Sequence, residues 1–327
     1  MNLRKDYNYS IWCDFIEREF LDGKFKELLN SATIHGATSN PAIFENSITT
    51  SKAYIDDIKS MQHLSPKEIY EALAIADIKK AAQIMLTLYE KDQNDGFISI
   101  EVDPRLCDDA FGTIEEGTRL FKEINMPNVM IKVPATQAGY IAMKELTSMG
   151  INVNATLIFS LDQAKQCAKA LDEGIKQSPN SPKAVISIFV SRFDRVCDEL
   201  CKAKGLPSAK LGIINARKCY IEVEKLQNPN IRTLFASTGV KGDDLPKSYY
   251  IDELIYPNTI NTAPLDTINA YIDSGKKRVL EIDDQYDDFI QTLKSHDIDI
   301  DNISSTLLKD GLEAFKLSFA NMLDKIK

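Results

Sequence analysis

A lysine lies inside a stretch that otherwise has the composition of a buried strand. The segment from Val129 to Ala135 reads VMIKVPA, with Lys132 at its centre. An ammonium group taken out of water without a partner is so costly that it usually loses its proton or acquires a compensating charge. An amine held in an apolar pocket becomes a nucleophile toward carbonyl carbons and forms a Schiff base with them. Lys132 is therefore the first candidate for covalent chemistry.

Two carboxylates are candidates for the proton transfers that Schiff-base chemistry requires. Asp14 ends the run SIWCD, and Glu101 lies in FISIEV. Loss of the carbinolamine oxygen as water needs a proton donor, which Glu101 can supply through a water held by Thr156. Asp14 can take the proton from the hydroxyl whose carbon departs as an aldehyde. The structural alternative is that both carboxylates are only salt-bridge partners of Lys132.

Candidate phosphate ligands follow two later apolar runs. Arg192 follows AVISIFV, and the segment STGVK brings Ser237 and Lys241 after RTLFAST. A guanidinium group offers a forked contact to phosphate, a serine offers a hydroxyl, and a lysine offers a point charge. Solvated loop charges are the ordinary alternative. We expect the phosphate of a substrate to bind here.

Short β-rich runs that could position these residues alternate with longer helical patterns. Strands interleaved with helices pair in parallel, and eight of them closing on themselves form a barrel. The predicted strands are residues 10–14, 36–40, 97–102, 129–134, 151–157, 184–190, 232–238 and 250–255. The expected fold class is therefore α/β, an eightfold parallel β/α (TIM) barrel with additional helices.

The helices outside this repeat are also marked in the sequence. The capping pattern SPKE begins at Ser65, and SLDQ begins at Ser160. The segment 41–96 is too long for one helix, so we expect two helices with a loop near residues 61–65. Apolar residues recur at spacings of three and four from Leu308 to Ile326, which predicts an amphipathic helix packed against the barrel or across one mouth. We expect one domain, 1–327, with a helical insertion at about 42–95 and a C-terminal helix at about 304–327.

Polar residues gather near the C-terminal ends of the predicted strands, where barrels of this kind carry their chemistry. Seven of the eight strands contribute: Asp14, Asn40, Glu101, Lys132, Asn154 with Thr156, Ser187 and Ser237. Strand alternation places Asn154 and Thr156 on one inward face, where buried polar atoms require hydrogen-bond partners. Each residue alone has a structural explanation, such as the turn expected at Asn40–Pro41. Their gathering at one end of a barrel favours a catalytic centre.

Composition excludes several other classes of function. With 44% hydrophobic and 27% charged residues, the 327-residue chain is typical of a folded globular protein. A net charge of -9 disfavours nucleic-acid binding, which needs a basic face. No secretory signal or apolar run of membrane-spanning length is present, so we expect a cytoplasmic protein. The six cysteines form no CxxC pair, and three histidines without HExxH give no expectation of a metal site.

The sequence resembles the transaldolase family. The matching segments are GATSNPAIF, SIEVDPRL, IKVPAT, NVNATLIFS, ISIFVSRFD and ASTGVK. The stretch YIDELIYPNTINTAP also looks like the corresponding region of the longer bacterial members. The resemblance covers most of the chain. It implies that Lys132 is the Schiff-base lysine, Asp14 the general acid/base, and Glu101 with Thr156 the pair that handles the catalytic water.

The resemblance also implies a set of substrate-binding residues. These are Asn40, Asn154, Ser187, Phe189, Arg192, Ser237 and Lys241. The two amides would hold a dihydroxyacetone unit with the Ser187 hydroxyl beside it, and Arg192 and Ser237 would bind phosphate. Many family members carry an arginine shortly after that serine, where this chain has Lys241 at a slightly different spacing.

The implied reaction transfers a three-carbon dihydroxyacetone unit from sedoheptulose 7-phosphate or fructose 6-phosphate to glyceraldehyde 3-phosphate or erythrose 4-phosphate, in the pentose phosphate pathway and without a cofactor. The related aldolase branch tends to have tyrosine in place of Phe189 and glutamine in place of Glu101, so both positions favour transfer. Two alternatives stay open: a Schiff-base aldolase that releases free dihydroxyacetone, and a non-catalytic barrel that binds phosphosugars. The enzyme is expected to be a monomer or a homodimer.

Overall fold

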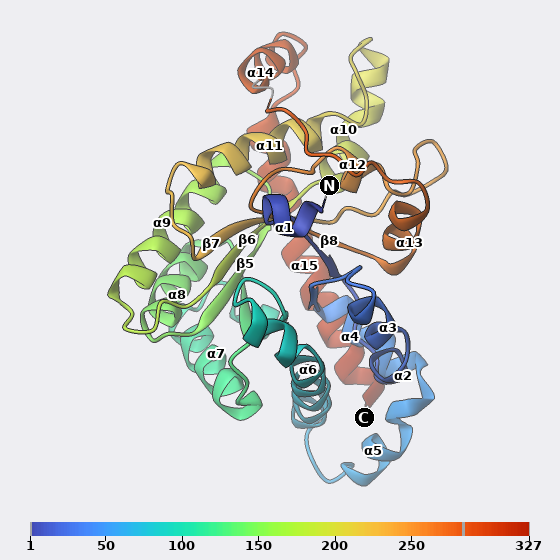
Figure 1. Cartoon of the computed structure of the whole chain (residues 1–327), viewed down its shortest axis with the longest axis vertical. Helices are drawn as coiled ribbons and strands as arrows, with labels where there is room; N and C mark the ends of the chain where they lie inside the picture. The colour runs from blue at the N-terminus through green and yellow to red at the C-terminus, as the bar shows by residue number, and fades with distance from the viewer. Residues whose placement is uncertain (1, 283–284, 327) are drawn as a thin grey trace.

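Eight parallel strands form a closed barrel in the computed structural model, which describes residues 2–282 and 285–326 (Figure 1). The strands pair in chain order, and β8 closes the ring by pairing with β1. They are β1 Ser10–Cys13, β2 Gly36–Thr38, β3 Phe97–Glu101, β4 Val129–Pro134, β5 Asn152–Ile158, β6 Ala184–Phe189, β7 Ile231–Ala236 and β8 Thr259–Ala263. The predicted TIM-barrel class is confirmed.

The eighth strand is the one that sequence reasoning placed wrongly. We predicted residues 250–255, but the structure has the short helix α12 (Tyr249–Asp252) there, and the strand follows at Thr259–Ala263. The buried residues Tyr250, Ile251, Leu254 and Ile255 recur in pairs four apart, which is a helical spacing and not the alternation of a strand. The β-branched run that follows Pro257 is the true strand.

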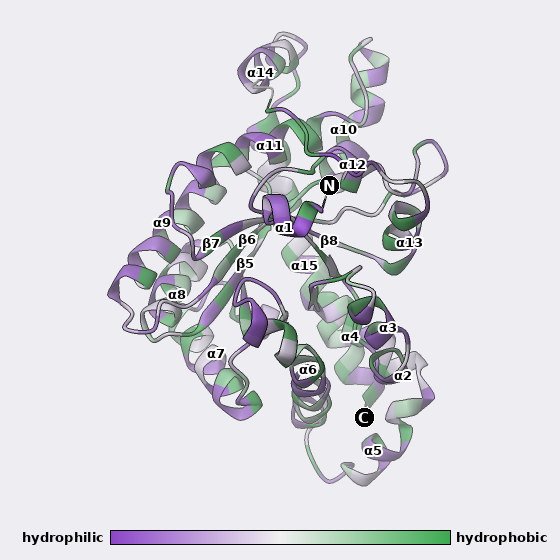
Figure 2. Cartoon of the chain, in the orientation of Figure 1, coloured by the Kyte–Doolittle hydropathy of each residue, from purple (hydrophilic) through white to green (hydrophobic). Residues whose placement is uncertain are grey.

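The other helices surround the barrel, and hydrophilic and hydrophobic residues alternate along outer helices such as α8 and α9 (Figure 2). Besides α12, they are α1 Leu3–Tyr7, α2 Arg18–Asp22, α3 Lys24–Asn30, α4 Pro41–Thr50, α5 Ile55–Ser60, α6 Pro66–Lys91, α7 Ala110–Ile124, α8 Gln137–Ser148, α9 Leu161–Gln177, α10 Ser191–Ala203, α11 Leu211–Glu224, α13 Leu265–Ser274, α14 Tyr286–Ser295 and α15 Ile300–Ile326. There are also two short 3-10 helices, η1 Lys52–Tyr54 and η2 Pro104–Leu106. The capping boxes at Ser65 and Ser160 both form as predicted.

The two helical additions position the site. Between β2 and β3 the chain forms α4, η1, α5 and α6, so the predicted two helices are too few. The predicted loop is found, because α5 ends at Ser60 and α6 begins at Pro66. The C-terminal helix α15 begins at Ile300, earlier than the predicted 304. It packs against α4, α6, α10 and η2 and also contacts β5. It therefore lies across the end of the barrel at which the strands finish.

The interior is packed at the opposite end of the barrel. Trp12 lies in a buried cluster with Phe97, Leu234 and other residues of the inward faces. Gly36 permits this packing because a Cβ there would lie 2.5 Å from the Trp12 ring. Below the cluster, Arg232 donates hydrogen bonds to the carbonyl oxygens of residues 8, 94 and 259. The open part of the interior is thus at the C-terminal ends of the strands.

Candidate active site

Strand register brings three of the predicted residues into one row. Glu101 on β3 is opposite Lys132 on β4, and Lys132 is opposite Asn154 on β5. Side chains at matched positions of neighbouring parallel strands point to the same face of the sheet, which here is the barrel interior. All three residues are buried. The row therefore places an amine between a carboxylate and an amide.

Lys132 is compensated inside the barrel rather than raised to its rim. Its Nζ lies 3.3 Å from Glu101 Oε2 and donates a hydrogen bond of 3.0 Å to the carbonyl oxygen of Ser39. The ring of Phe315, from α15, lies with its centroid 5.8 Å from Nζ. Only 5% of Lys132 is exposed. The amine thus faces a confined space with one carboxylate beside it and an aromatic ring over it.

Asp14 lies just beyond β1 and is held by hydroxyl groups. Thr38 Oγ1 donates a hydrogen bond of 2.6 Å to Asp14 Oδ1, and the hydroxyls of Thr38 and Thr262 lie 2.7 Å apart. Burial raises the pKa of Asp14 above its ordinary value, although the positive charge of Lys132 and the hydrogen bond from Thr38 oppose the rise. An aspartate with a raised pKa is suited to accept and return a proton.

Glu101 and Thr156 complete the group of candidate catalytic residues. Burial raises the pKa of Glu101 against the opposing charge of Lys132. Thr156 is fully buried, and its Oγ1 has no hydrogen-bond partner among the described residues. The next residue, Leu157, has φ 57°, at a register shift between β5 and β6. A bulky residue with positive φ is strained, and such bulges re-aim side chains near functional sites.

The two predicted amides are both fixed by hydrogen bonds. Asn154 Nδ2 donates to Ser99 Oγ at 3.1 Å, and its Oδ1 accepts from Ser187 Oγ at 2.6 Å. Asn40 is the N-cap of α4, and its Oδ1 accepts a hydrogen bond from the backbone N–H of Ile43. The carbonyl oxygen of the Asn40 amide is thus occupied by the helix, which leaves its NH₂ group to donate to a ligand.

These residues surround a cavity of about 190 Å³ at the C-terminal ends of the strands. Nine predicted residues line it: Asp14, Asn40, Lys132, Asn154, Thr156, Ser187, Phe189, Arg192 and Ser237. Glu101 is not among the lining residues and reaches the cavity through its ion pair with Lys132. The structure thus gathers ten of the eleven predicted site residues at one place.

The side of the cavity that is predicted to bind phosphate is formed by the loops after β6 and β7. The guanidinium carbon of Arg192 lies 5.0 Å from the centre of the Phe189 ring, and no carboxylate of the described residues lies within salt-bridge distance of it. Ser237 has φ 55°, and its hydroxyl lies 3.2 Å from that of Ser191. Both Arg192 and Ser237 therefore present donors toward the cavity.

Lys241 is the predicted residue that the structure does not bring to the cavity. It lies in the loop after β7, is exposed, and is not among the lining residues. Gly242, with φ 80°, follows it in that loop. A role for Lys241 in binding phosphate stays a prediction.

Sequence reasoning missed several residues of the site: the polar or aromatic residues Thr38, Ser99, Thr262 and Phe315, and the small lining residues Ala42 and Ala236. Thr38 lies two positions before Asn40, so strand alternation alone indicates that it faces the same side. Thr262 was hidden because the eighth strand was placed too early in the chain. In the sequence Phe315 is one apolar residue of an amphipathic helix, and nothing there distinguishes it from residues that pack elsewhere.

The fold and the site define the class of protein: a β/α barrel with a buried lysine–carboxylate centre at the C-terminal ends of its strands. Residues 11–326 match the family model for transaldolase/fructose-6-phosphate aldolase. The chain is 47% identical to a transaldolase of Campylobacter jejuni subsp. jejuni serotype O:23/36 (strain 81-176), over 97% of this chain and 98% of the relative. It is 46% identical to a transaldolase of Helicobacter pylori (strain P12), over 96% and 98%. The chain belongs to the transaldolase/fructose-6-phosphate aldolase family.

No helix among residues 2–282 and 285–326 is long and apolar enough to cross a membrane.

Proposed function

We propose that this protein is a transaldolase, which moves a dihydroxyacetone unit from a ketose phosphate to an aldose phosphate through a Schiff base on Lys132. The observation that carries the proposal is the placement of the Lys132 amine inside the cavity, 3.3 Å from Glu101 and in the same cavity as Asp14. The donor is sedoheptulose 7-phosphate or fructose 6-phosphate, and the acceptor is glyceraldehyde 3-phosphate or erythrose 4-phosphate. We further propose that it works as a single-domain, cytoplasmic enzyme of the pentose phosphate pathway.

The first half of the reaction forms the imine and breaks a carbon–carbon bond. The Lys132 amine attacks C2 of the ketose, and the carbinolamine oxygen leaves as water with a proton that Glu101 supplies through a water held by Thr156. Asp14 then takes the proton of the C4 hydroxyl, the C3–C4 bond breaks, and C4 becomes the aldehyde carbon of the released product. The bonding electrons move into the imine, which becomes an enamine on Lys132.

The second half reverses these steps with another aldehyde. C3 of the enamine attacks the acceptor carbonyl, and Asp14 returns its proton to the oxygen that becomes the new hydroxyl. Water then adds to C2 of the restored imine, and the product ketose leaves Lys132 as the free amine. Because the same groups act in both directions, the site requires no cofactor for this exchange.

The enamine must be shielded from protonation until the acceptor arrives. Phe315 lies over Lys132, and Phe189 lines the same cavity without offering a hydroxyl group. Both rings are mostly buried, at 6% exposure each. Apolar walls that exclude water favour transfer over release of the three-carbon unit.

The dihydroxyacetone unit and the phosphate have separate groups to bind them. Asn154 and Ser187 are already oriented by their mutual hydrogen bond, and Asn40 offers the NH₂ group of its amide. Arg192 and Ser237 would receive the phosphate at the loops after β6 and β7. A cavity of about 190 Å³ is suited to a short polar chain rather than to a large ligand.

A coupled assay separates the proposal from its nearest rival. Fructose 6-phosphate is supplied with or without erythrose 4-phosphate, and the glyceraldehyde 3-phosphate produced is measured. A transaldolase requires the acceptor for turnover, so adding it should raise the rate strongly. If the acceptor leaves the rate unchanged, the enzyme is an aldolase that releases dihydroxyacetone. If neither mixture yields product above that of the Lys132→Met variant, the protein is a non-catalytic phosphosugar-binding barrel.

A further inference from the structure

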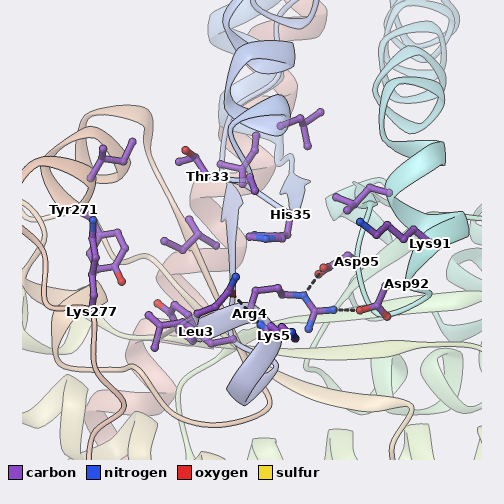
Figure 3. Close-up of a pocket in the computed structure, with 18 residues that line it drawn as sticks. Leu3, Arg4, Lys5, Thr33, His35, Lys91, Asp92, Asp95, Tyr271 and Lys277 are labelled. Atoms are coloured by element: carbon purple, nitrogen blue, oxygen red, sulfur yellow. Dashed lines mark hydrogen bonds and ion pairs between the residues drawn. The ribbon is translucent and has the colours of Figure 1, made fainter.

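A second cavity, of about 820 Å³, lies near the N-terminal ends of β1 and β2 and outside the barrel (Figure 3). Its lining comes from α1, the ends of α3 and α6, the residues before β2, and α13. Ile11 lines it from the outer face of β1, three residues before Asp14, which lines the active-site cavity. At about 3.3 Å per residue the two positions are roughly 10 Å apart along the chain. The two cavities are therefore separate.

The inner wall of this second cavity is apolar and partly aromatic. Ile11 and Ile34 are buried, and the rings of Tyr9 and Tyr271 are exposed by only 2% and 6%. Figure 3 shows Tyr271 across the cavity from His35, with Leu3 of α1 between the two sides. Cavities of this volume with apolar walls are typical of small-molecule sites.

Unsatisfied polar atoms are built into that wall. The phenolic oxygen of Tyr9 is buried and has no hydrogen-bond partner among the described residues, and the same holds for Nδ1 of His35. Burial raises the pKa of Tyr9, so its phenol stays protonated. Both atoms have almost no accessible surface, so they lie behind the cavity wall and do not face the cavity itself.

The rim of the second cavity is positively charged. Arg4 is neutralised by ion pairs with Asp92 and Asp95. Three further lining cations, Lys5, Lys91 and Lys277, are exposed, and the described residues place no carboxylate within salt-bridge distance of them. They come from α1, from the end of α6 and from the segment after α13. An anionic group at the rim would meet charges that converge from separate elements.

We propose that this cavity is a binding site for a small aromatic anion, whose ring lies against the apolar wall and whose phosphate or carboxylate lies at Lys5, Lys91 and Lys277. The apolar wall excludes a bare inorganic anion as the preferred ligand, and the lysine rim excludes a neutral hydrocarbon. The inference does not depend on the reaction proposed for the barrel.

The test of this site is the binding of 1-naphthyl phosphate to the intact protein, measured by titration calorimetry. Its two halves, 1-naphthol and inorganic phosphate, are titrated in parallel. Because ring and anion contacts add, we expect the whole molecule to bind at least about tenfold more tightly than either half. The proposal is overturned if 1-naphthyl phosphate binds no more tightly than 1-naphthol or inorganic phosphate, or if its binding is undetectable at millimolar concentration.

Two double variants locate the binding. Lys91→Glu with Lys277→Glu reverses two charges of the rim, and we expect it to weaken binding by roughly tenfold or more. Lys59→Glu with Lys294→Glu changes the net charge equally at exposed positions outside the cavity and should leave binding within about twofold. If both double variants lose affinity for 1-naphthyl phosphate equally, the probe binds elsewhere and the proposed site is contradicted. The same conclusion follows if fructose 6-phosphate displaces the probe.

Discussion

Glu101 and Lys132 are opposite each other in the β3–β4 register, and their side chains meet inside the barrel with Nζ 3.3 Å from Oε2. This pair explains how an ammonium group is tolerated in a strand that is otherwise apolar. The carboxylate that compensates the charge is also the group proposed to deliver a proton when the imine forms. The same contact therefore serves stability in the free enzyme and chemistry in the substrate complex.

Replacing the nucleophile should remove activity and keep the fold. Lys132→Met preserves most of the side-chain volume, and the Glu101 left behind can bind a proton because burial already raises its pKa. We expect transfer activity to fall by roughly 10³-fold or more, since no other amine can form the covalent intermediate. Activity assays and thermal unfolding together measure both effects.

The double variant Lys132→Met with Glu101→Gln is the control for that experiment. It removes the carboxylate whose partner is lost, so it should unfold at a temperature equal to or above that of Lys132→Met. Unfolded Lys132→Met protein that the second substitution does not rescue would indicate that the lysine is mainly structural.

Thr38 is expected to set the acidic limit of activity. Its hydroxyl donates to Asp14 and favours the carboxylate, so Thr38→Val should raise the pKa of Asp14 further above its ordinary value. Asp14 must be ionised to take the substrate proton, and activity is therefore lost as pH falls through its pKa. The acidic limb of kcat/KM should therefore move to higher pH. Thr49→Val, on α4 and outside the cavity, should leave the limb in place; movement to lower pH in Thr38→Val would contradict the assignment.

Phe189 is expected to protect the enamine. A tyrosine at this position would bring a hydroxyl into the cavity and offer a proton or hold a water near the intermediate. We expect Phe189→Tyr to increase acceptor-independent cleavage of fructose 6-phosphate relative to transfer, by on the order of tenfold. Phe111→Tyr, at a position that is 87% exposed, is the matched control. A ratio that responds equally to both substitutions would show that the hydroxyl has no specific effect.

Gly311 on α15 sets the position of Arg192. A Cβ at this residue would lie 3.1 Å from Arg192 Nη1 and 3.0 Å from Leu157 Cδ2. Gly311→Ala should push the guanidinium aside and raise KM for the phosphorylated donor by roughly fivefold, as expected for a loss of about 1 kcal/mol. Stability should change little, because alanine is the better helix former and offsets the tight contact. Asn321→Ala on the same helix is the control and should leave KM unchanged. An unchanged KM in Gly311→Ala would show that α15 does not affect phosphate binding.

The barrel could be predicted because its strands are short apolar runs with clear boundaries. Val129–Pro134 was placed to the residue, and the first seven strands were placed within two residues of their observed ends. The region between β7 and β8 was placed wrongly, because Tyr250 and Ile251 are an aromatic and a β-branched residue, and both types are also common in strands. Their burial on one helical face, and the contact of the Tyr250 hydroxyl with Asp194, become evident only in the structure.

The site could be predicted where chemistry requires an unusual residue in a strand, as at Lys132 and Glu101. It could not be predicted where the contribution is a common residue type or a backbone atom. The Ser39 carbonyl and Phe315 contact Lys132, and Thr262 contacts Thr38, which holds Asp14. These contributions become identifiable only when the strands and α15 are placed in space. Lys241 is the opposite case: it is close to Ser237 in the sequence, but its exposed side chain is not among the residues that line the cavity.

Borohydride trapping is the most direct test of the central claim. The protein is incubated with fructose 6-phosphate, reduced with sodium borohydride, digested, and analysed by mass spectrometry. The account predicts one reduced adduct of the three-carbon unit, located on Lys132 and lost in Lys132→Met. An adduct on any other lysine, or none in the wild-type protein, would contradict it.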